Sequence, residues 1–409
     1  MMNRVAQRDE FMTGIWALAA LWFGLALVAS LFAIRFRVST ALAEIVVGAA
    51  AQAILGATVG SEALGVGEPW VKFLAGLAAI LLTFLAGAEL DPQVFKLKWK
   101  EAAAIGVVSF VVPFLGCAAA GHYLLGWGVR PSLLAGVALS ATSVAVVYTV
   151  MMEYGLNKTD YGKTLLAACF ITDLGSVLAL GLIFAPFTYK TLIFVGATVA
   201  SFMALPWLTS RLFERFGGRP SEPETRFLLL CLLGLGALAA WADSEAVLPA
   251  YLIGMALAGT VGRDHAFIRR LRTVTIGLLT PFYFIRAGYL VSIPAVIAAP
   301  VAFVFFLAVE ASTKIASIYP VARYFGSPRR DAMYTTLLMS TGLTFGTIAA
   351  LFGLSRDIID KSQYSVLVAV IIATAIIPTM IANSFFLPRH LLPDDAPAER
   401  AAPVAKETQ

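Results

Sequence analysis

About thirteen apolar runs of roughly twenty residues follow one another along this chain, separated by short charged or Pro/Gly-containing stretches. A helix of that length spans a ~30 Å hydrocarbon core. The runs therefore predict an all-α polytopic membrane protein. Its expected spans are residues 11–34, 38–59, 69–90, 102–122, 131–152, 162–185, 190–209, 226–242, 246–262, 274–294, 298–321, 332–353 and 363–387.

Composition supports this class and excludes others. Hydrophobic residues make up 59% and charged residues 13%, against ~45–50% and ~25% in soluble domains. Cys117, Cys169 and Cys231 lie in apolar runs without a CxxC motif or clustered His, so we expect no disulfide framework, metal site or cofactor. Neither HExxH nor GxSxG occurs, so we expect no enzyme, and no nucleic-acid partner is needed to explain the net charge of +5.

The distribution of Lys and Arg predicts the orientation. Loops on one side, together with the C-terminal segment, carry about 21 of the 30 basic residues, and the other side carries about 7. Because basic loops stay in the cytoplasm, the C-terminus is expected inside and the N-terminus outside. The remaining two, Arg286 and Lys314, fall within expected spans and become candidates for function.

Asp173 lies near the middle of the apolar run 165–184. A carboxylate there costs about 2.5–3.5 kcal/mol, and acids that persist inside membranes usually line a substrate, ion or proton pathway. Asp173 is therefore the leading candidate. The alternative is a structural pair with a neighbouring helix.

Two spans contain runs of Ser, Thr and Gly at mid-span, Leu139–Val144 and Ser340–Thr347. Such runs can unwind where they line a cavity, although small polar residues also serve helix packing. Asp173 lies one helix after the first run and Lys314 one helix before the second. This layout predicts an inverted repeat with two broken crossing helices, whose half-helix partial charges a carboxylate and an ammonium would compensate.

The chain resembles the monovalent cation:proton antiporters, in the bacterial branch of sodium/proton antiporters and potassium-efflux systems, from about residue 38 to 383. The resemblance rests on AEIVVG at 43–48, FLAGAELD at 84–91, the run 139–144, Thr172-Asp173, PFYFIRAG at 281–288 and Lys314. It implies an NhaA-like fold, a homodimer and a location in the bacterial inner membrane. It also implies the following division: interface helices at 1–101 and 226–297, core helices at 102–189 and 298–388, a linker helix and loop at 190–225, and a cytoplasmic tail at 389–409 that we expect to be disordered.

The same resemblance assigns ion and proton binding to Asp173 with Thr172, and the core lysine to Lys314. Relatives thought to be electrogenic carry Asp-Asp where this chain has Thr172-Asp173. Because one carboxylate holds a proton or a cation but not both, competition at Asp173 would couple exchange of Na⁺, or of K⁺ or Li⁺, for H⁺. Auxiliary oxygens are expected from the broken helices: Thr142, Ser143, Thr341 and Thr344.

Lys314 has two predicted roles. A fixed counter-charge gives electroneutral exchange, which we favour, whereas a Lys314 that gives up its proton when the cation binds makes exchange electrogenic. A sodium-coupled solute symporter on the same scaffold is a further alternative.

Two further groups have structural interpretations. Arg286 is expected to form an ion pair with Glu89 or Glu44, which lie near span ends where solvated positions suffice. The basic, Phe-containing loop 210–226 is expected to lie on anionic lipid as an amphipathic linker.

Overall fold

Every regular element of the described residues is helical. The computed structural model describes residues 2–36, 39–58, 64–88, 94–156, 159–184, 188–242, 244, 246–261 and 264–392. Within these ranges, nine helices are long and apolar enough to cross a membrane, and shorter apolar helices lie at Thr40–Leu55, Val129–Ser140 and Val247–Leu257. The all-α fold class is confirmed, while a total of thirteen spans stays a prediction.

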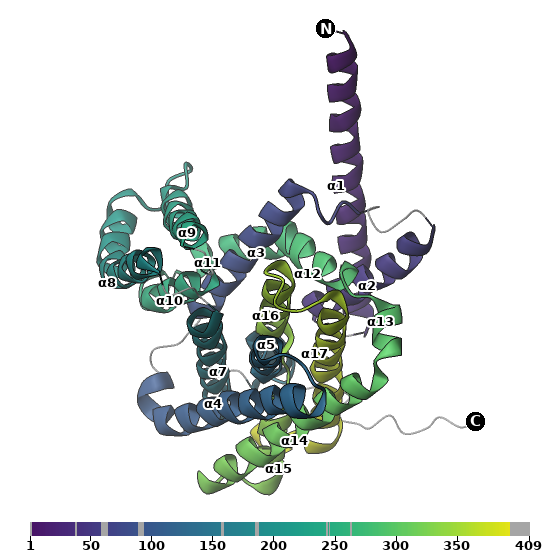
Figure 1. Cartoon of the computed structure of the whole chain (residues 1–409). Coiled ribbons are helices and arrows are strands. Elements are labelled where there is room, and N and C mark those ends of the chain that lie inside the picture. Colours follow the sequence, from purple (N-terminus) through teal and green to yellow (C-terminus); the bar gives the residue numbers. More distant parts are fainter. Residues whose placement is uncertain are drawn as a thin grey trace, which may run out of the picture.

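The helices follow the expected apolar runs in chain order (Figure 1). The first half contains α1 (Met2–Phe36), α2 (Thr40–Thr58), α3 (Pro69–Ala88), α4 (Val94–Ala119), η1 (Ala120–Leu124), α5 (Val129–Ser140), α6 (Val144–Glu153), α7 (Asp160–Phe184) and α8 (Tyr189–Phe216). The second half contains α9 (Pro223–Trp241), α10 (Val247–Leu257), α11 (His265–Val274), η4 (Thr275–Leu279), α12 (Thr280–Tyr289), α13 (Ile293–Ala298), α14 (Pro300–Tyr324), α15 (Arg329–Leu338), α16 (Leu343–Ser355), α17 (Lys361–Ile381), η5 (Ala382–Phe386) and η6 (Arg389–Leu391).

Two helix pairs in the predicted interface region pack backbone against backbone. α2 meets α12 through Gly48 and Gly288, where a Cβ on Gly288 would lie 2.8 Å from the carbonyl carbon of Ile45. α3 meets α10 in the same way through Gly87 and Gly254. Small residues that let backbones approach are a common basis of helix association in lipid, and they hold these four helices together here.

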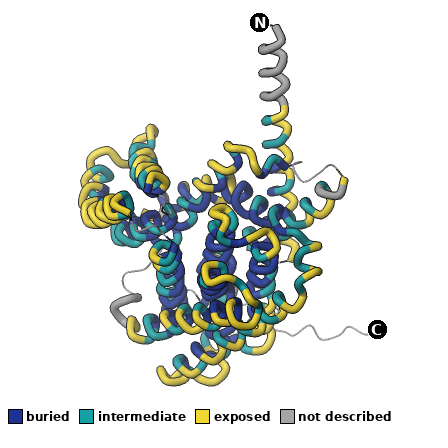
Figure 2. Tube along the Cα trace, in the orientation of Figure 1, coloured by how far each residue is buried: buried dark blue, intermediate teal, exposed yellow. Residues whose placement is uncertain are grey.

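The most buried part of the chain surrounds the two interrupted helices. α4 packs against α5, α7 and α14, and α16 packs against α5 and α17. In the span Arg329–Ser355, 83% of the most apolar window is buried, against 22% in α8, which lies at the edge of the molecule (Figure 2). Non-helical backbone at membrane depth is tolerated where protein encloses it, and this group provides that enclosure.

The predicted linker loop is partly helical. α8 continues to Phe216, so the first residues of the region 210–226 belong to a helix, and α9 begins at Pro223. Arg211 lies over the Trp207 ring, 4.2 Å from its centroid, and Arg270 of α11 pairs with Glu222 at 2.6 Å. The turn between α8 and α9 is therefore tied to the short basic helix α11.

Candidate functional site

The interruptions lie at the centre of the buried group, and the unwound segments touch. α5 ends at Ser140 and α6 begins at Val144, which confirms the first predicted break. The second break lies between α15 and α16 at residues 339–342, at the edge of the predicted run, so that Thr344 belongs to the first turn of α16. The backbone N–H of Ser143 donates to the carbonyl of Thr341 and joins the two segments.

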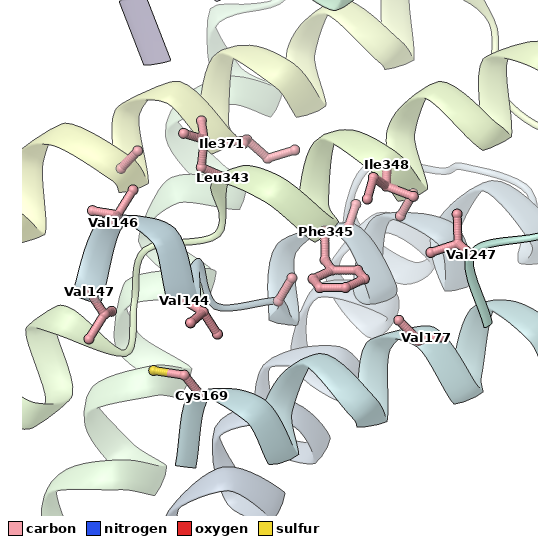
Figure 3. Packing of buried hydrophobic residues seen from close by; sticks show 14 of the residues in the cluster. Val144, Val146, Val147, Cys169, Val177, Val247, Leu343, Phe345, Ile348 and Ile371 are labelled. Atoms are coloured by element: carbon pink, nitrogen blue, oxygen red, sulfur yellow. The ribbon is translucent and has the colours of Figure 1, made fainter. Parts of the chain in front are cut away.

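Glycine allows this close approach. A Cβ on Gly346 would lie 2.6 Å from the carbonyl oxygen of Ala138. Apolar side chains pack around the two segments: Figure 3 shows Val144 and Phe345 beside the unwound backbone, and Cys169 Sγ of α7 lies 3.3 Å from Met339 Sδ. The residues of both unwound segments are thus buried.

Asp173 is placed at this junction by α7 and is 1% exposed. The backbone N–H of Thr142, in the first unwound segment, donates a hydrogen bond to its carboxylate. Its Oδ1 has no hydrogen-bond partner among the described residues. The carboxylate therefore lies at the N-terminal end of α6, where the helix partial charge is positive, and keeps one oxygen available for a proton or a cation.

Lys314 reaches the opposite ends of the broken helices from α14 and is fully buried. Its Nζ donates to the carbonyls of Ser140 at 2.8 Å and Met339 at 3.0 Å, and lies 3.3 Å from Thr142 Oγ1 and 3.1 Å from Ser109 Oγ. The last carbonyls of a helix lack intrahelical partners and carry partial negative charge. One side chain thus compensates the C-terminal ends of both α5 and α15.

The neighbours of Lys314 Nζ are mostly hydrogen-bond acceptors. The hydroxyl of Thr142 donates its single proton to the carbonyl of Met339 at 2.9 Å, so it accepts from Nζ. The carbonyls of Ser140 and Met339 are acceptors as well. These three acceptors, with the hydroxyl of Ser109 as a fourth neighbour, favour an ammonium at Nζ.

Asp173 and Lys314 interact electrostatically, yet no ion pair within 4.0 Å joins them in the described part of the chain. Lys314 lies at the C-terminal ends of α5 and α15, whereas Asp173 lies at the N-terminal end of α6.

The predicted auxiliary hydroxyls already have protein partners. Thr172 Oγ1 lies 3.1 Å from one carbonyl of α4 and from one of α7. Ser143 Oγ lies 3.2 Å from Thr344 Oγ1 across the junction, and Thr341 Oγ1 donates to a carbonyl of α15 at 2.8 Å. A hydroxyl that donates its proton still has lone pairs for a cation, so ligation by these groups stays a prediction.

The predicted ion pair between Arg286 and Glu44 is not formed. Arg286 Nε donates to the carbonyl of Val66 at 3.0 Å. Glu44, expected in a solvated position, is instead 1% exposed and accepts from Thr280 Oγ1 at 3.3 Å. The reason is that the end of α12 that carries Arg286 faces residues 64–68, whereas Glu44 packs against its beginning. The other predicted partner, Glu89, lies outside the described residues.

Arg286 and Lys72 line a cavity of about 640 Å³ between α3, α12 and α16. Asp173 does not line it. Near this boundary, two tyrosines join predicted core helices to predicted interface helices: Tyr251 of α10 donates to a carbonyl of α7, and Tyr364 of α17 to a carbonyl of α12, each at 2.8 Å.

Sequence reasoning missed a buried acid inside a predicted span, Glu310. It lies in α14 one turn before Lys314 and is 1% exposed. The criterion that singled out Asp173, a carboxylate inside an apolar run, would have found it, because the run 300–324 contains Glu310 as its acidic residue.

A family model described as "Sodium/hydrogen exchanger, transmembrane" matches residues 22–386. The chain is 24% identical over 334 residues to the probable Na(+)/H(+) antiporter 3 of Methanocaldococcus jannaschii, covering 78% of this chain and 84% of that protein. It is 25% identical over 334 residues to the glutathione-regulated potassium-efflux system protein KefC of Klebsiella pneumoniae, covering 76% of this chain. It spans 52% of the KefC length.

Among solved structures, the fold is similar to that of the sodium proton antiporter MjNhaP1 from Methanocaldococcus jannaschii at pH 8. The TM-score is 0.68 at 14% sequence identity, over 91% of this chain and 96% of that one. The fold is thus described more specifically as similar to that of MjNhaP1 than as NhaA-like, which is the fold expected from the sequence.

Proposed function

This chain belongs to the sodium/hydrogen exchanger family, and we propose that it exchanges a monovalent cation for protons by alternating access at Asp173. It is an integral membrane transport protein and not an enzyme. We propose Na⁺ as the cation, because the archaeal relative is named a Na(+)/H(+) antiporter. K⁺ is the second candidate, since KefC is a potassium-efflux protein, and Li⁺ is the third.

The observation that carries the proposal is the free oxygen of Asp173. Its carboxylate is buried at the junction of two unwound segments, one oxygen has no partner among the described residues, and the backbone beside it is non-helical. Midplane sites at broken helices are typical of secondary transporters, where unwound carbonyls help to coordinate the ion. Thr172 and the junction hydroxyls of Thr142, Ser143, Thr341 and Thr344 are the proposed additional oxygens.

Competition at Asp173 couples the two fluxes. A proton and a dehydrated cation cannot share the same carboxylate oxygen, so the site crosses the membrane loaded with one or the other. We propose that residues 102–189 and 298–388 move as the core against the interface helices of 1–101 and 226–297, with 190–225 as the linker. Two copies pair through the interface helices, as the resemblance to dimeric antiporters implies.

We propose electroneutral exchange. Lys314 uses its three N–H groups on the helix ends, and this supports a fixed ammonium while one cation replaces one proton at Asp173. Electrogenic exchange, with Lys314 as a second proton carrier, is the alternative that the same experiment tests. We also propose a bacterial inner-membrane location, with the N-terminus outside, the C-terminus in the cytoplasm and the α8–α9 turn on anionic lipid.

The test is an ion-jump assay on the purified chain in liposomes that enclose a pH-sensitive dye. Addition of Na⁺ should move protons in wild type and in a Glu101→Gln control, whose acid pairs with Lys98 at 3.7 Å in α4, but not in Asp173→Asn. Retained exchange in Asp173→Asn refutes the proposal. A rate that changes with imposed membrane potential replaces the electroneutral cycle by the electrogenic one, and Na⁺ uptake that requires a solute and moves no protons indicates a symporter.

A further inference from the structure

Glu310 is a buried acid that the exchange cycle at Asp173 does not use. It is 1% exposed, and its Oε2 has no hydrogen-bond partner among the residues that the structure describes. No ion pair within 4.0 Å involves it in the part of the chain that the structure describes. Lys314 lies four residues further along the same helix, but its ammonium points to the helix ends instead.

The surroundings of Glu310 are closed and offer few charges. α4 lies so near α14 that a Cβ on Gly116 would approach Thr313 Cγ2 to 2.6 Å. From α4, the thiol of Cys117 is the titratable group that interacts with Glu310, and from α14 it is Lys314. The other described elements that pack on α14, namely η1, α13, α15 and α17, add no titratable group that interacts with it.

Burial without a donor decides the charge of this carboxyl group. An ionised carboxylate removed from water is strongly unfavourable unless it is paired and hydrogen-bonded. Glu310 lacks an ion pair in the state described here, so it carries its proton. The acceptors around Lys314 Nζ favour an ammonium in the same state, which makes the pair a neutral acid beside a cation.

We propose that Glu310 is a second proton-binding site of the transport core, occupied while Lys314 lies at the junction and vacated when Lys314 turns back to pair with it. Residues four apart on a helix are neighbours, and side chains lean toward the helix N-terminus, so Lys314 leans toward Glu310. On deprotonation the carboxyl O–H bond breaks, the proton leaves to water, and the electron pair stays on the carboxylate. Lys314 keeps its three protons and leaves the carbonyls of Ser140 and Met339.

The transport consequence rests on the proposed function. Loss of the Glu310 proton removes the counter-charge from the helix ends beside Asp173, so exchange slows as the medium becomes alkaline. Once the pH exceeds the value at which Glu310 loses its proton, the wild-type rate falls about tenfold for each further pH unit, because the active form holds one proton more. Gln has the shape of the neutral acid and cannot ionise, so Glu310→Gln keeps Lys314 at the junction.

Infrared spectroscopy tests the proton directly. In an Asp173→Asn background at neutral pH, the C=O stretch of protonated carboxylic acids should lose intensity when Glu310→Gln is added. It should not change with Glu101→Gln, and Glu310→Asp should retain it. An unchanged band in the Glu310→Gln protein, shown to be folded by its melting curve, overturns the proposal.

The pH profile of exchange is the second measurement. Glu310→Gln should match wild type at neutral pH and keep its rate at alkaline pH, where wild type has lost most of its own. Parallel profiles, or a folded Glu310→Gln protein that is inactive at every pH, overturn the proposal. Exchange that survives in Asp173→Asn contradicts the function at Asp173 but leaves the infrared result intact, so the two failures are distinguishable.

Discussion

Replacing Lys314 by Met tests whether its ammonium is a fixed part of the helix junction. Met is of similar length and removes all three N–H donors. The carbonyl of Ser140 then loses its donor at 2.8 Å, whereas that of Met339 keeps the Thr142 hydroxyl at 2.9 Å. An unsatisfied buried carbonyl costs about 1–3 kcal/mol, and each lost bond from a charged donor costs about 1.5–3 kcal/mol.

The expected loss of stability is about 3–5 kcal/mol, the range typical of removing one member of a buried charge network. It is smaller than the sum of the separate bonds because the cost of burying the ammonium disappears with it. Asp173 also loses the nearby positive charge with which it interacts. Lys314→Met should therefore be less stable and inactive, while the fold is retained.

Thermal unfolding of the purified protein in detergent measures this effect. The matched control is Lys361→Met, at the exposed first residue of α17, which should change the unfolding free energy by no more than about 0.5 kcal/mol. Lys314→Arg keeps a permanent charge, so exchange that persists in it supports the fixed role. Equal melting curves for Lys314→Met and Lys361→Met would refute the reasoning.

Three further predictions concern packing, domain motion and the cavity. Gly288→Ala should lower stability by about 1–3 kcal/mol through overpacking against α2, and a melting point at or above that of Gly196→Ala, which meets nothing within 4 Å, would contradict this. Tyr251→Phe and Tyr364→Phe each remove a bond between core and interface worth about 1 kcal/mol, so each should shift the ratio of inward- to outward-facing protein about fivefold in crosslinking or spin-label distance measurements; unchanged distributions would show that these bonds persist through the cycle. Lys72→Gln removes a positive charge from the cavity wall and so lessens the repulsion of a cation there. The apparent KM for the cation should fall about twofold at low ionic strength and stay unchanged at ~1 M salt. An effect independent of salt would exclude an electrostatic cause.

The sequence predicts this junction well because its signals are local. Asp173 is recognisable from one apolar run, and the first break from the polar residues inside another. The second break begins at Met339, before Ser340, and ends where α16 begins at Leu343. Thr344 therefore lies in the first turn of α16, where its hydroxyl meets that of Ser143. Low helix propensity indicates which segment can unwind, but the contact between the two half-helices determines the residue at which each helix resumes.

Partners between distant helices are harder to predict. Arg286 could be assigned to Glu44 only by supposing which turns of α2 and α12 face each other, and that register depends on the contact of Gly48 with Gly288. The register of α2 against α12 in the structure places Glu44 beside Thr280 instead. Glu310 escapes the sequence prediction for a different reason, because the orientation rule considers Lys and Arg and gives little weight to acidic residues.

The described core contains two carboxyl groups with an unpartnered oxygen near Lys314, and their surroundings give them different capacities. Asp173 lies beside unwound backbone, whose carbonyls and hydroxyls are the proposed additional oxygens for a dehydrated cation. Glu310 lies within the regular helix α14, whose carbonyls are used in intrahelical bonds, and its neighbour on α4 is a thiol. Glu310 can thus hold a proton but not a cation. Because Lys314 donates its N–H groups to the helix ends, Asp173 is the proposed cation site, and Asp173 and Glu310 are the proposed proton sites.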